Sequence, residues 1–145
     1  MIIVVMLLAF ATGGMARAEE GTSTFYVQLI RGTDTDKAPM PGAKAVGPRL
    51  AGMFRPVFRY KGFWEITRQQ VAVAPGEVKR VELGNGRAVE IDLRSPKERK
   101  VTAYHSGKVG DRTVVPAGDG MTIIGGSRED KSVWFIVVRR DRPQD

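Results

Sequence analysis

Hydrophobic and polar residues alternate along most of the chain with a period of two, which is typical of β-strands. The alternation is clearest at Val89, Ile91 and Leu93, which we expect to face a core, while Glu90 and Asp92 face solvent. We expect further strands over 24–30, 63–73, 79–83, 101–105, 113–115, 121–126 and 132–138. Turn signals separate these runs at intervals of roughly 8–12 residues. The pattern therefore predicts a mainly β fold, an antiparallel sandwich or small barrel of seven to eight strands.

One segment has a helical period instead, and it lies between the first two predicted strands. Proline is favoured in the first turn of a helix, so Pro48 is a suitable start. Apolar residues then recur at spacings of three and four, at Leu50, Met53, Phe54, Val57 and Phe58. Pro56 is expected to kink or end this short helix near Arg55. The long loop 32–48 precedes it, and loops of this length are often functional or mobile.

Several local features refine the predicted sheet. Asn85-Gly86 is a strong signal for a hairpin turn. The apolar phase shifts within 63–73, which predicts a bulge or a bend. The run 132–138 is apolar on both phases, so we expect a central strand that is covered on both faces. The polar tail 139–145 contains a proline and is expected to fray.

The N-terminus is predicted to be an export signal. Residues 1–10 form an apolar run too short to span a bilayer, and Ala16-Arg17-Ala18 matches the small-x-small pattern of a cleavage site. A basic residue before the apolar run is missing, so either the true start lies upstream or the α-amino group supplies the charge. The alternative is a buried N-terminal strand or helix. We expect a signal peptide over 1–18, a single β-rich domain over 19–145, and a periplasmic or secreted location.

Composition limits the chemistry that the protein can perform. The chain has no cysteine, which excludes disulfides, thiol proteases and Cys-ligated metal sites. With 42% hydrophobic and 27% charged residues, it has the composition of a globular protein rather than a disordered one. No segment after the leader is apolar enough to span a membrane. The net charge of +7 favours acidic partners, unless it serves only to keep the domain soluble.

Basic residues are densest just after the predicted hairpin. The cluster offers four cations as candidate binding residues, Arg94, Lys97, Arg99 and Lys100. Basic loops on a β scaffold can bind anionic polymers when aromatic residues supply stacking, and Tyr104 is the nearby aromatic. A second cluster contains Arg139, Arg140 and Arg142. The alternative interpretation is a solvated corner of the sheet.

No catalytic, metal-binding or cofactor-binding residue is predicted. His105 is the one histidine, and no Cys or serine motif gives it a partner for general-base catalysis. The Asp34 and Asp36 pair lacks the further oxygen ligands that calcium needs. The glycine-rich run 120–126 lacks the Lys-Ser/Thr ending of a phosphate loop, so Gly125-Gly126 instead predict positive φ angles or a bulge.

Two stretches resemble a group of small exported bacterial β-rich proteins that have no assigned activity. One is the basic-aromatic run Phe58-Arg59-Tyr60-Lys61-Gly62-Phe63-Trp64-Glu65-Ile66, followed by Val71-Ala72-Val73. The other is the late element Gly120-Met121-Thr122-Ile123-Ile124-Gly125-Gly126, with the apolar strand after it. The resemblance extends from Leu50 to Val138 and implies no catalytic residues.

These observations favour a small, exported, non-catalytic module that binds or supports an envelope or extracellular component. Its partner would be an unidentified protein or another envelope component, and strand-edge pairing would allow a homo-oligomer. The alternative is a binder of an anionic polymer, namely nucleic acid, anionic lipid or glycan, through the basic loops. An uncharacterised hydrolase is the third interpretation, and a concave site near His105 or the acidic residues would support it.

Overall fold

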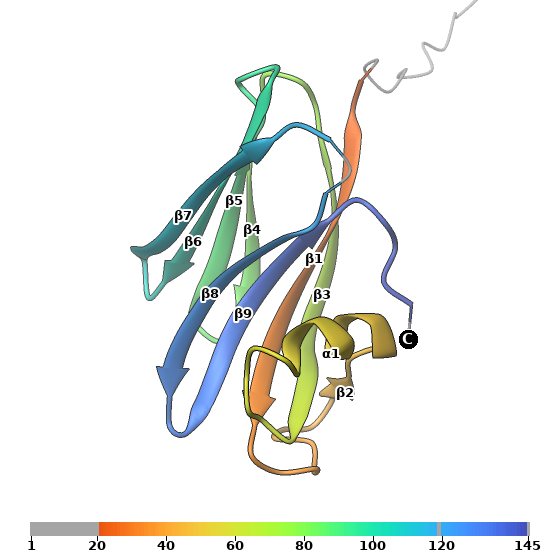
Figure 1. Ribbon diagram of the computed structural model, residues 1–145. Coiled ribbons are helices and arrows are strands. Elements are labelled where there is room, and N and C mark those ends of the chain that lie inside the picture. The colour runs from red at the N-terminus through yellow and green to blue at the C-terminus, as the bar shows by residue number, and fades with distance from the viewer. Residues whose placement is uncertain (1–20, 119, 145) are drawn as a thin grey trace, which may run out of the picture.

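Two antiparallel sheets pack face to face in the computed structural model, which describes residues 21–118 and 120–144 (Figure 1). The five-stranded sheet has the order β2-β3-β1-β9-β8, and the four-stranded sheet has the order β4-β5-β6-β7. The strands are β1 (Ser23–Thr33), β2 (Lys44–Ala45), β3 (Gly62–Val73), β4 (Val78–Gly84), β5 (Arg87–Asp92), β6 (Glu98–His105), β7 (Lys108–Pro116), β8 (Thr122–Glu129) and β9 (Ser132–Arg139). The predicted mainly β, antiparallel sandwich is confirmed. The two-residue β2 was not predicted, and it divides the long loop 32–48.

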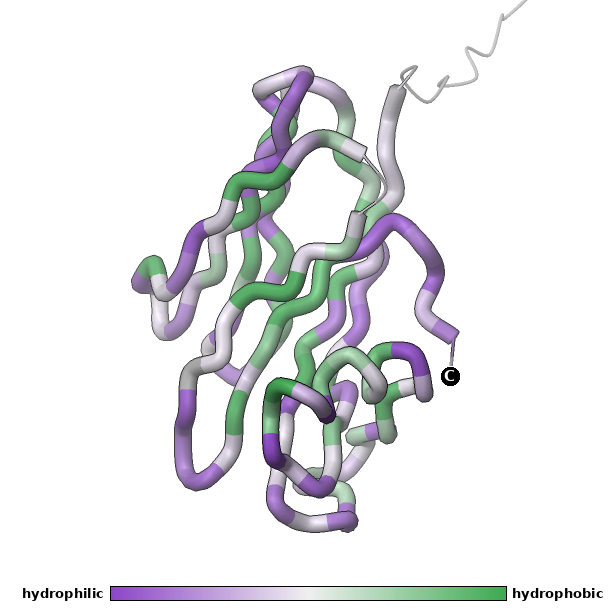
Figure 2. The backbone as a smooth tube through the Cα atoms, viewed as in Figure 1, coloured by the Kyte–Doolittle hydropathy of each residue, from purple (hydrophilic) through white to green (hydrophobic). Residues whose placement is uncertain are grey.

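The main core lies between the sheets, and it is built from the inward phase of each strand. Its fully buried members include Val27, Leu29, Val89, Ile91 and Val101. Figure 2 shows the hydrophobic run that continues along β9. This strand lies between β1 and β8 and is buried over its whole length, so the prediction of a central strand covered on both faces is confirmed.

The outer face of the five-stranded sheet carries the short helix α1 (Pro48–Phe54). Phe54 stacks on Phe63 of β3 and Phe135 of β9, with ring centroids 5.1 and 5.0 Å apart. The helix begins at a proline and ends before Pro56, as predicted. A second core thus lies under α1, and β9 contributes Phe135 and Val137 to it.

Three irregular positions lie where the sequence predicted them, while the register shift between Ala103 and Tyr104 of β6 was not predicted. Asn85 and Gly86 have φ angles of 55° and 71° and join β4 to β5 in a tight hairpin. Ile66 is an extra residue in β3, because Leu29 pairs with Thr67 while the next residue pairs with Glu65. A second bulge interrupts β8 at Gly125-Gly126, where both φ angles are positive.

The described part of the C-terminal tail, residues 139–144, lies against the fold, where the sequence pattern predicted a frayed end. Arg139 is buried as the last residue of β9, and Pro143 is also buried. The tail runs back along the face that bears α1, so that the Gln144 carbonyl oxygen lies 2.5 Å from the position of a Cβ on Gly47 (Figure 1). The proline here lies within a packed segment, not at a free end.

The predicted leader, 1–18, lies outside the described residues. Among the residues that the structure describes, no helix is long and apolar enough to cross a membrane.

Candidate binding cleft at the edge of the sandwich

A cleft of about 300 Å³ opens between the two sheets at the edge formed by β7 and β8. Figure 1 shows β6 and β7 leaning away from β8 and β9 toward the turn that joins β6 to β7. The inward phases of four strands supply an apolar lining, formed by Leu29, Ala103, Ile124, Trp134 and Ile136. A cleft of this size and lining is typical of sites that hold small apolar groups.

Trp134 lies between two arginine side chains at one end of this cleft. The guanidinium carbon of Arg87 is 4.1 Å from the ring centroid and that of Arg31 is 5.0 Å away. Arg87 is buried, and its Nη2 donates to Glu129 Oε2 at 2.9 Å. Arg31 donates from Nε to Ser132 Oγ at 3.1 Å. The indole is thus held by cation–π contacts whose cations are themselves fixed by hydrogen bonds.

The charge on Glu129 is stabilised by the same arrangement. Its hydrogen bond with Arg87 lowers the pKa of this carboxyl below its ordinary value. Glu129 is therefore ionised near neutral pH, and its negative charge compensates the positive charge of Arg87 at this rim of the cleft.

The bulge in β8 keeps the mouth of the cleft open. Gly125 and Gly126 line it without side chains. Their φ angles, 112° and 98°, are ones that L-amino acids with a Cβ rarely adopt. A Cβ on Gly125 would also lie 3.0 Å from the Trp134 carbonyl oxygen. The sequence predicted positive φ angles or a bulge at Gly125-Gly126, and this bulge is the local feature that opens the cleft.

His105 and Asp111 also border the cleft, so the concave site that would support a hydrolase is present. Within the described part of the chain, however, the His105 imidazole forms no hydrogen bond or ion pair. Among the residues whose side chains the structure describes, no Ser, Thr or Cys lines the cleft. The Tyr104 hydroxyl lies 3.5 Å from Glu90 Oε2 instead. The described lining thus presents His105 and Asp111 without a Ser, Thr or Cys nucleophile bonded to either of them.

The metal and phosphate alternatives gain no support from the geometry. The described residues contain no group of three or more His, Cys, Asp or Glu side chains placed to hold a metal ion. Asp34 and Asp36 are exposed in the loop after β1. The run 120–126 leads into strand β8, not into a helix.

The four basic residues predicted as a binding corner separate into different environments. Arg99 is buried, and its guanidinium donates to the carbonyl oxygens of Gly118 at 3.1 Å and Gly120 at 2.7 Å. Its neighbour Lys100 belongs to the opposite face, because successive residues of β6 alternate. Lys97 is exposed in the loop. The four cations therefore do not converge on one face, and Arg99 holds the loop after β7 in place.

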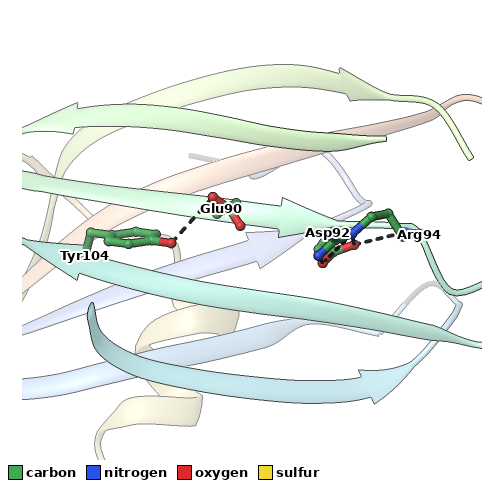
Figure 3. Close-up of polar contacts among 4 residues, drawn as sticks. All are labelled: Glu90, Asp92, Arg94 and Tyr104. Carbon is green, nitrogen blue, oxygen red and sulfur yellow. Dashed lines mark hydrogen bonds and ion pairs between the residues drawn. The ribbon is translucent and has the colours of Figure 1, made fainter. Parts of the chain in front are cut away.

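Arg94 lies at the same corner and is bonded to Asp92 (Figure 3). Its Nη2 is 2.7 Å from Asp92 Oδ2, and its Nε is 3.1 Å from Oδ1. These bonds, with one from the Arg94 backbone N–H, lower the pKa of Asp92 to about 2. Figure 3 also shows Glu90 on the same strand, partly buried, whereas Asp92, which was expected to face solvent, is only 8% exposed beside Arg94.

The second arginine cluster is also divided by the fold. Arg139 is buried and bonded to Asp141, whereas Arg140 is only partly buried and lies over the ring of Phe25, 5.6 Å from its centroid. Arg140 borders a hollow of about 160 Å³ together with Ser95 and Arg99. The two basic clusters, separate in sequence, thus meet at one end of the sandwich.

Comparisons of the chain with protein-family models, curated proteins and solved structures found no match. The geometry of the cleft is therefore the basis for assigning a function.

Proposed function

We propose that the protein is an exported, non-catalytic binding module whose edge cleft holds an apolar or aromatic group of its ligand. One observation carries the proposal. The cleft between β6–β7 and β8–β9 is lined by core side chains such as Leu29, Ile124 and Ile136, yet it opens to solvent. Covering apolar surface releases about 25 cal/mol per Å² removed from water, so a ligand group that fills the cleft gains affinity from it.

The polar rim of the cleft supports recognition by shape more than by charge. Arg87 is already bonded to Glu129, so its charge is not available in full to a ligand. His105 and Asp111 add one weak base and one acid at the mouth. We therefore propose that the cleft binds the apolar group of the ligand and that the polar part of the ligand faces solvent.

A fluorescence titration tests this assignment. In a Trp64→Phe background the emission reports Trp134, because the chain has two tryptophans. Anilinonaphthalene sulfonate, an apolar ring system with a polar group, is the probe. We expect it to bind with a change in Trp134 emission, and Ala103→Leu, which adds bulk to the cleft lining, to weaken that binding.

Ile123→Leu is the matched control, since Ile123 lies on the opposite face of β8 from Ile124 and is 36% exposed. It should leave the titration unchanged. Equal binding by the parent and the Ala103→Leu protein, with both folded by circular dichroism, would contradict a binding role for the cleft.

Export is the second part of the proposal, and it rests on the leader pattern. The partner is then an envelope or extracellular component, in the periplasm or outside the cell. Intact-mass analysis of the natural product tests it, with a mature start at Glu19 expected. A soluble cytosolic product that retains Met1 would contradict export.

A second candidate function is binding of an anionic polymer at the corner after β5. The observation that favours it is the hollow where Arg140 meets the loop that carries Ser95 and Pro96. Arg94 and Lys97 remain exposed beside it. Such a site would lose affinity steeply with added salt, because phosphates or sulfates would release counterions.

A further inference from the structure

We propose that the protein has a second binding site, which takes an acidic sugar: a hydroxyl-bearing ring with a carboxylate or phosphate group. The site is a cavity of about 470 Å³ on the outer face of the five-stranded sheet. We call it the tail cavity, because the tail 141–144 forms one wall. The segment 44–50, which contains β2 and the start of α1, forms the other, and the volume is within the range of sites for small molecules.

The outer face of the five-stranded sheet is apolar where α1 covers it. Beside the helix, where the same face forms the floor of the tail cavity, it is polar. Gln28 of β1 and Glu65 and Arg68 of β3 form it. Gln28 Nε2 donates to Glu65 Oε2 at 2.6 Å, and Arg68 Nε donates to the same oxygen at 2.9 Å. These bonds hold all three side chains in place, and the ion pair with Arg68 compensates the negative charge of Glu65 within the floor.

One atom of this floor lacks a partner. Gln28 is 3% exposed, and its Oε1 is buried with no hydrogen-bond donor among the described residues. A buried carbonyl oxygen without a donor costs about 1–3 kcal/mol, so buried polar atoms are rarely left in this state. Because the side chain borders the cavity, a hydroxyl of a bound ligand can supply the missing donor.

Positive charge surrounds the same cavity. Among the described residues, five cations line it, namely Lys44, Arg49, Arg68, Arg139 and Arg142, against the carboxylates of Glu65 and Asp141. Asp141 is already bonded to Arg139 and lies 3.1 Å from Arg49 Nη1. Within the described part of the chain, neither Lys44 nor Arg142 forms an ion pair. These two exposed cations are available to an acidic group at the mouth of the cavity.

The two features together select the ligand class. Inorganic phosphate carries at most one or two acidic O–H donors near neutral pH, and its charged oxygens only accept hydrogen bonds, so it matches Gln28 Oε1 less well than a sugar ring with several hydroxyls does. A neutral sugar can donate to this oxygen but gains nothing from Lys44 and Arg142. A cation is opposed by the excess positive charge. A sugar acid or sugar phosphate satisfies both the buried oxygen and the cationic rim.

Calorimetric titration with four probes tests the proposal: glucuronate, a glucose phosphate, glucose and inorganic phosphate. We expect glucuronate or the glucose phosphate to bind about tenfold more tightly than glucose and than inorganic phosphate, as one charge-assisted hydrogen bond allows. The comparison between the two acidic sugars distinguishes a carboxylate from a phosphate. Gln28→Met keeps the volume of the side chain and should reduce the affinity by about tenfold.

Two double variants separate a site from a net-charge effect. Lys44→Gln with Arg142→Gln should reduce the affinity by about tenfold or more. Lys108→Gln with Arg112→Gln removes the same charge from the exposed strand β7 and should leave the affinity unchanged. These four residues are exposed, so both double variants should fold, and they test the site even if Gln28→Met fails to fold.

Three results would overturn the proposal. The first is no binding of either acidic sugar at millimolar concentration. The second is an equal loss in the two double variants. The third is binding of inorganic phosphate as tight as that of the glucose phosphate, which would show that the sugar hydroxyls contribute nothing.

Discussion

Arg87 of β5 lies over the indole ring of Trp134 of β9, with 4.1 Å between the guanidinium carbon and the ring centroid. The contact joins the two sheets at the edge where the cleft separates them. Both side chains are buried, and Arg87 is held from its other side by Glu129 of β8. The open edge of the sandwich is therefore braced at one point, which lets the cleft remain open without loss of the sheet packing.

Truncation of Trp134 tests this brace. Trp134→Ala removes a large buried side chain and the partner of two arginines, so it should lower the free energy of unfolding by about 3–5 kcal/mol. Urea unfolding measures it. Trp64→Ala is the comparison, because Trp64 is only half-buried, and its loss should be smaller. An unchanged unfolding midpoint for Trp134→Ala would show that Trp134 of β9 does not contribute to the stability of the core.

The basic corner should divide into one structural residue and several solvated ones. Arg99→Met leaves the Gly118 and Gly120 carbonyls without their donor and should cost about 2 kcal/mol or more in stability. Lys97→Gln should change stability by about 0.5 kcal/mol or less. Thermal unfolding distinguishes them, and equal midpoints for the two variants would contradict a structural role for Arg99.

Retention on an anionic matrix tests the corner as a binding site. Arg94→Gln with Lys97→Gln should elute earlier than wild type at low salt if the corner binds anions, and the difference should vanish as salt rises. Lys108→Gln with Arg112→Gln, on the exposed strand β7, is the control of equal charge. Arg140 is unsuitable for that control, because it borders the same hollow as Ser95. An equal change in elution for both variants would show that retention follows net charge alone and that the corner is not a binding site.

The Asp92–Arg94 pair should make part of the stability depend on pH. The folded-state pKa of Asp92 is about 2, below its ordinary value of 3.8, so its contribution is present above about pH 4. That contribution is lost as the pH falls from about 4 to about 2. It should be about 1 kcal/mol at most, since the Arg94 side chain is 65% exposed.

Unfolding of wild type and Asp92→Asn at pH 7 and pH 2 measures this effect. The difference between the two proteins should shrink at the lower pH, and Arg94→Gln should shrink it already at pH 7. A difference that stays constant between the two pH values would contradict the assignment.

Two glycines near the start of α1 should respond in opposite directions to the same substitution. Gly47→Ala places a methyl group 2.5 Å from the Gln144 carbonyl oxygen, so the tail must move. Gly52→Ala meets nothing within 4 Å and lies within the helix, where alanine is favoured by about 1 kcal/mol. Limited carboxypeptidase digestion should trim the tail faster in Gly47→Ala alone. Equal rates in both variants would show that the tail is not packed at Gly47.

Much of the fold follows from local signals in the sequence. The alternation in 87–93, the Asn85-Gly86 turn and the apolar run 132–138 each reflect a constraint that acts within a few residues. Arg99 shows where such signals were overlooked. It has the same phase as Val101 and Ala103, so alternation alone places it inward, but the charged run around it suggested a solvated corner.

The two cavities are harder to predict because distant segments form them. Gln28, Lys44, Glu65 and Arg142 come from four parts of the chain, and none has a motif around it. The packing of the tail depends on a contact with Gly47, about 97 residues away in sequence, which no local pattern encodes. The Gly125-Gly126 bulge was predictable, but its consequence for the cleft depends on how β7 diverges from β8.

The place of β9 in the sheet sets a limit on when the protein can fold. This strand comes last in chain order among the described strands, yet it lies between β1 and β8 and supplies side chains to both cores. Until it emerges, β1 has one unpaired edge and the aromatic cluster under α1 lacks Phe135. The five-stranded sheet and the aromatic cluster are therefore completed only once β9 has been synthesised. Both cores thus depend on the same late strand, so neither can reach its final packing before the other has its share of β9.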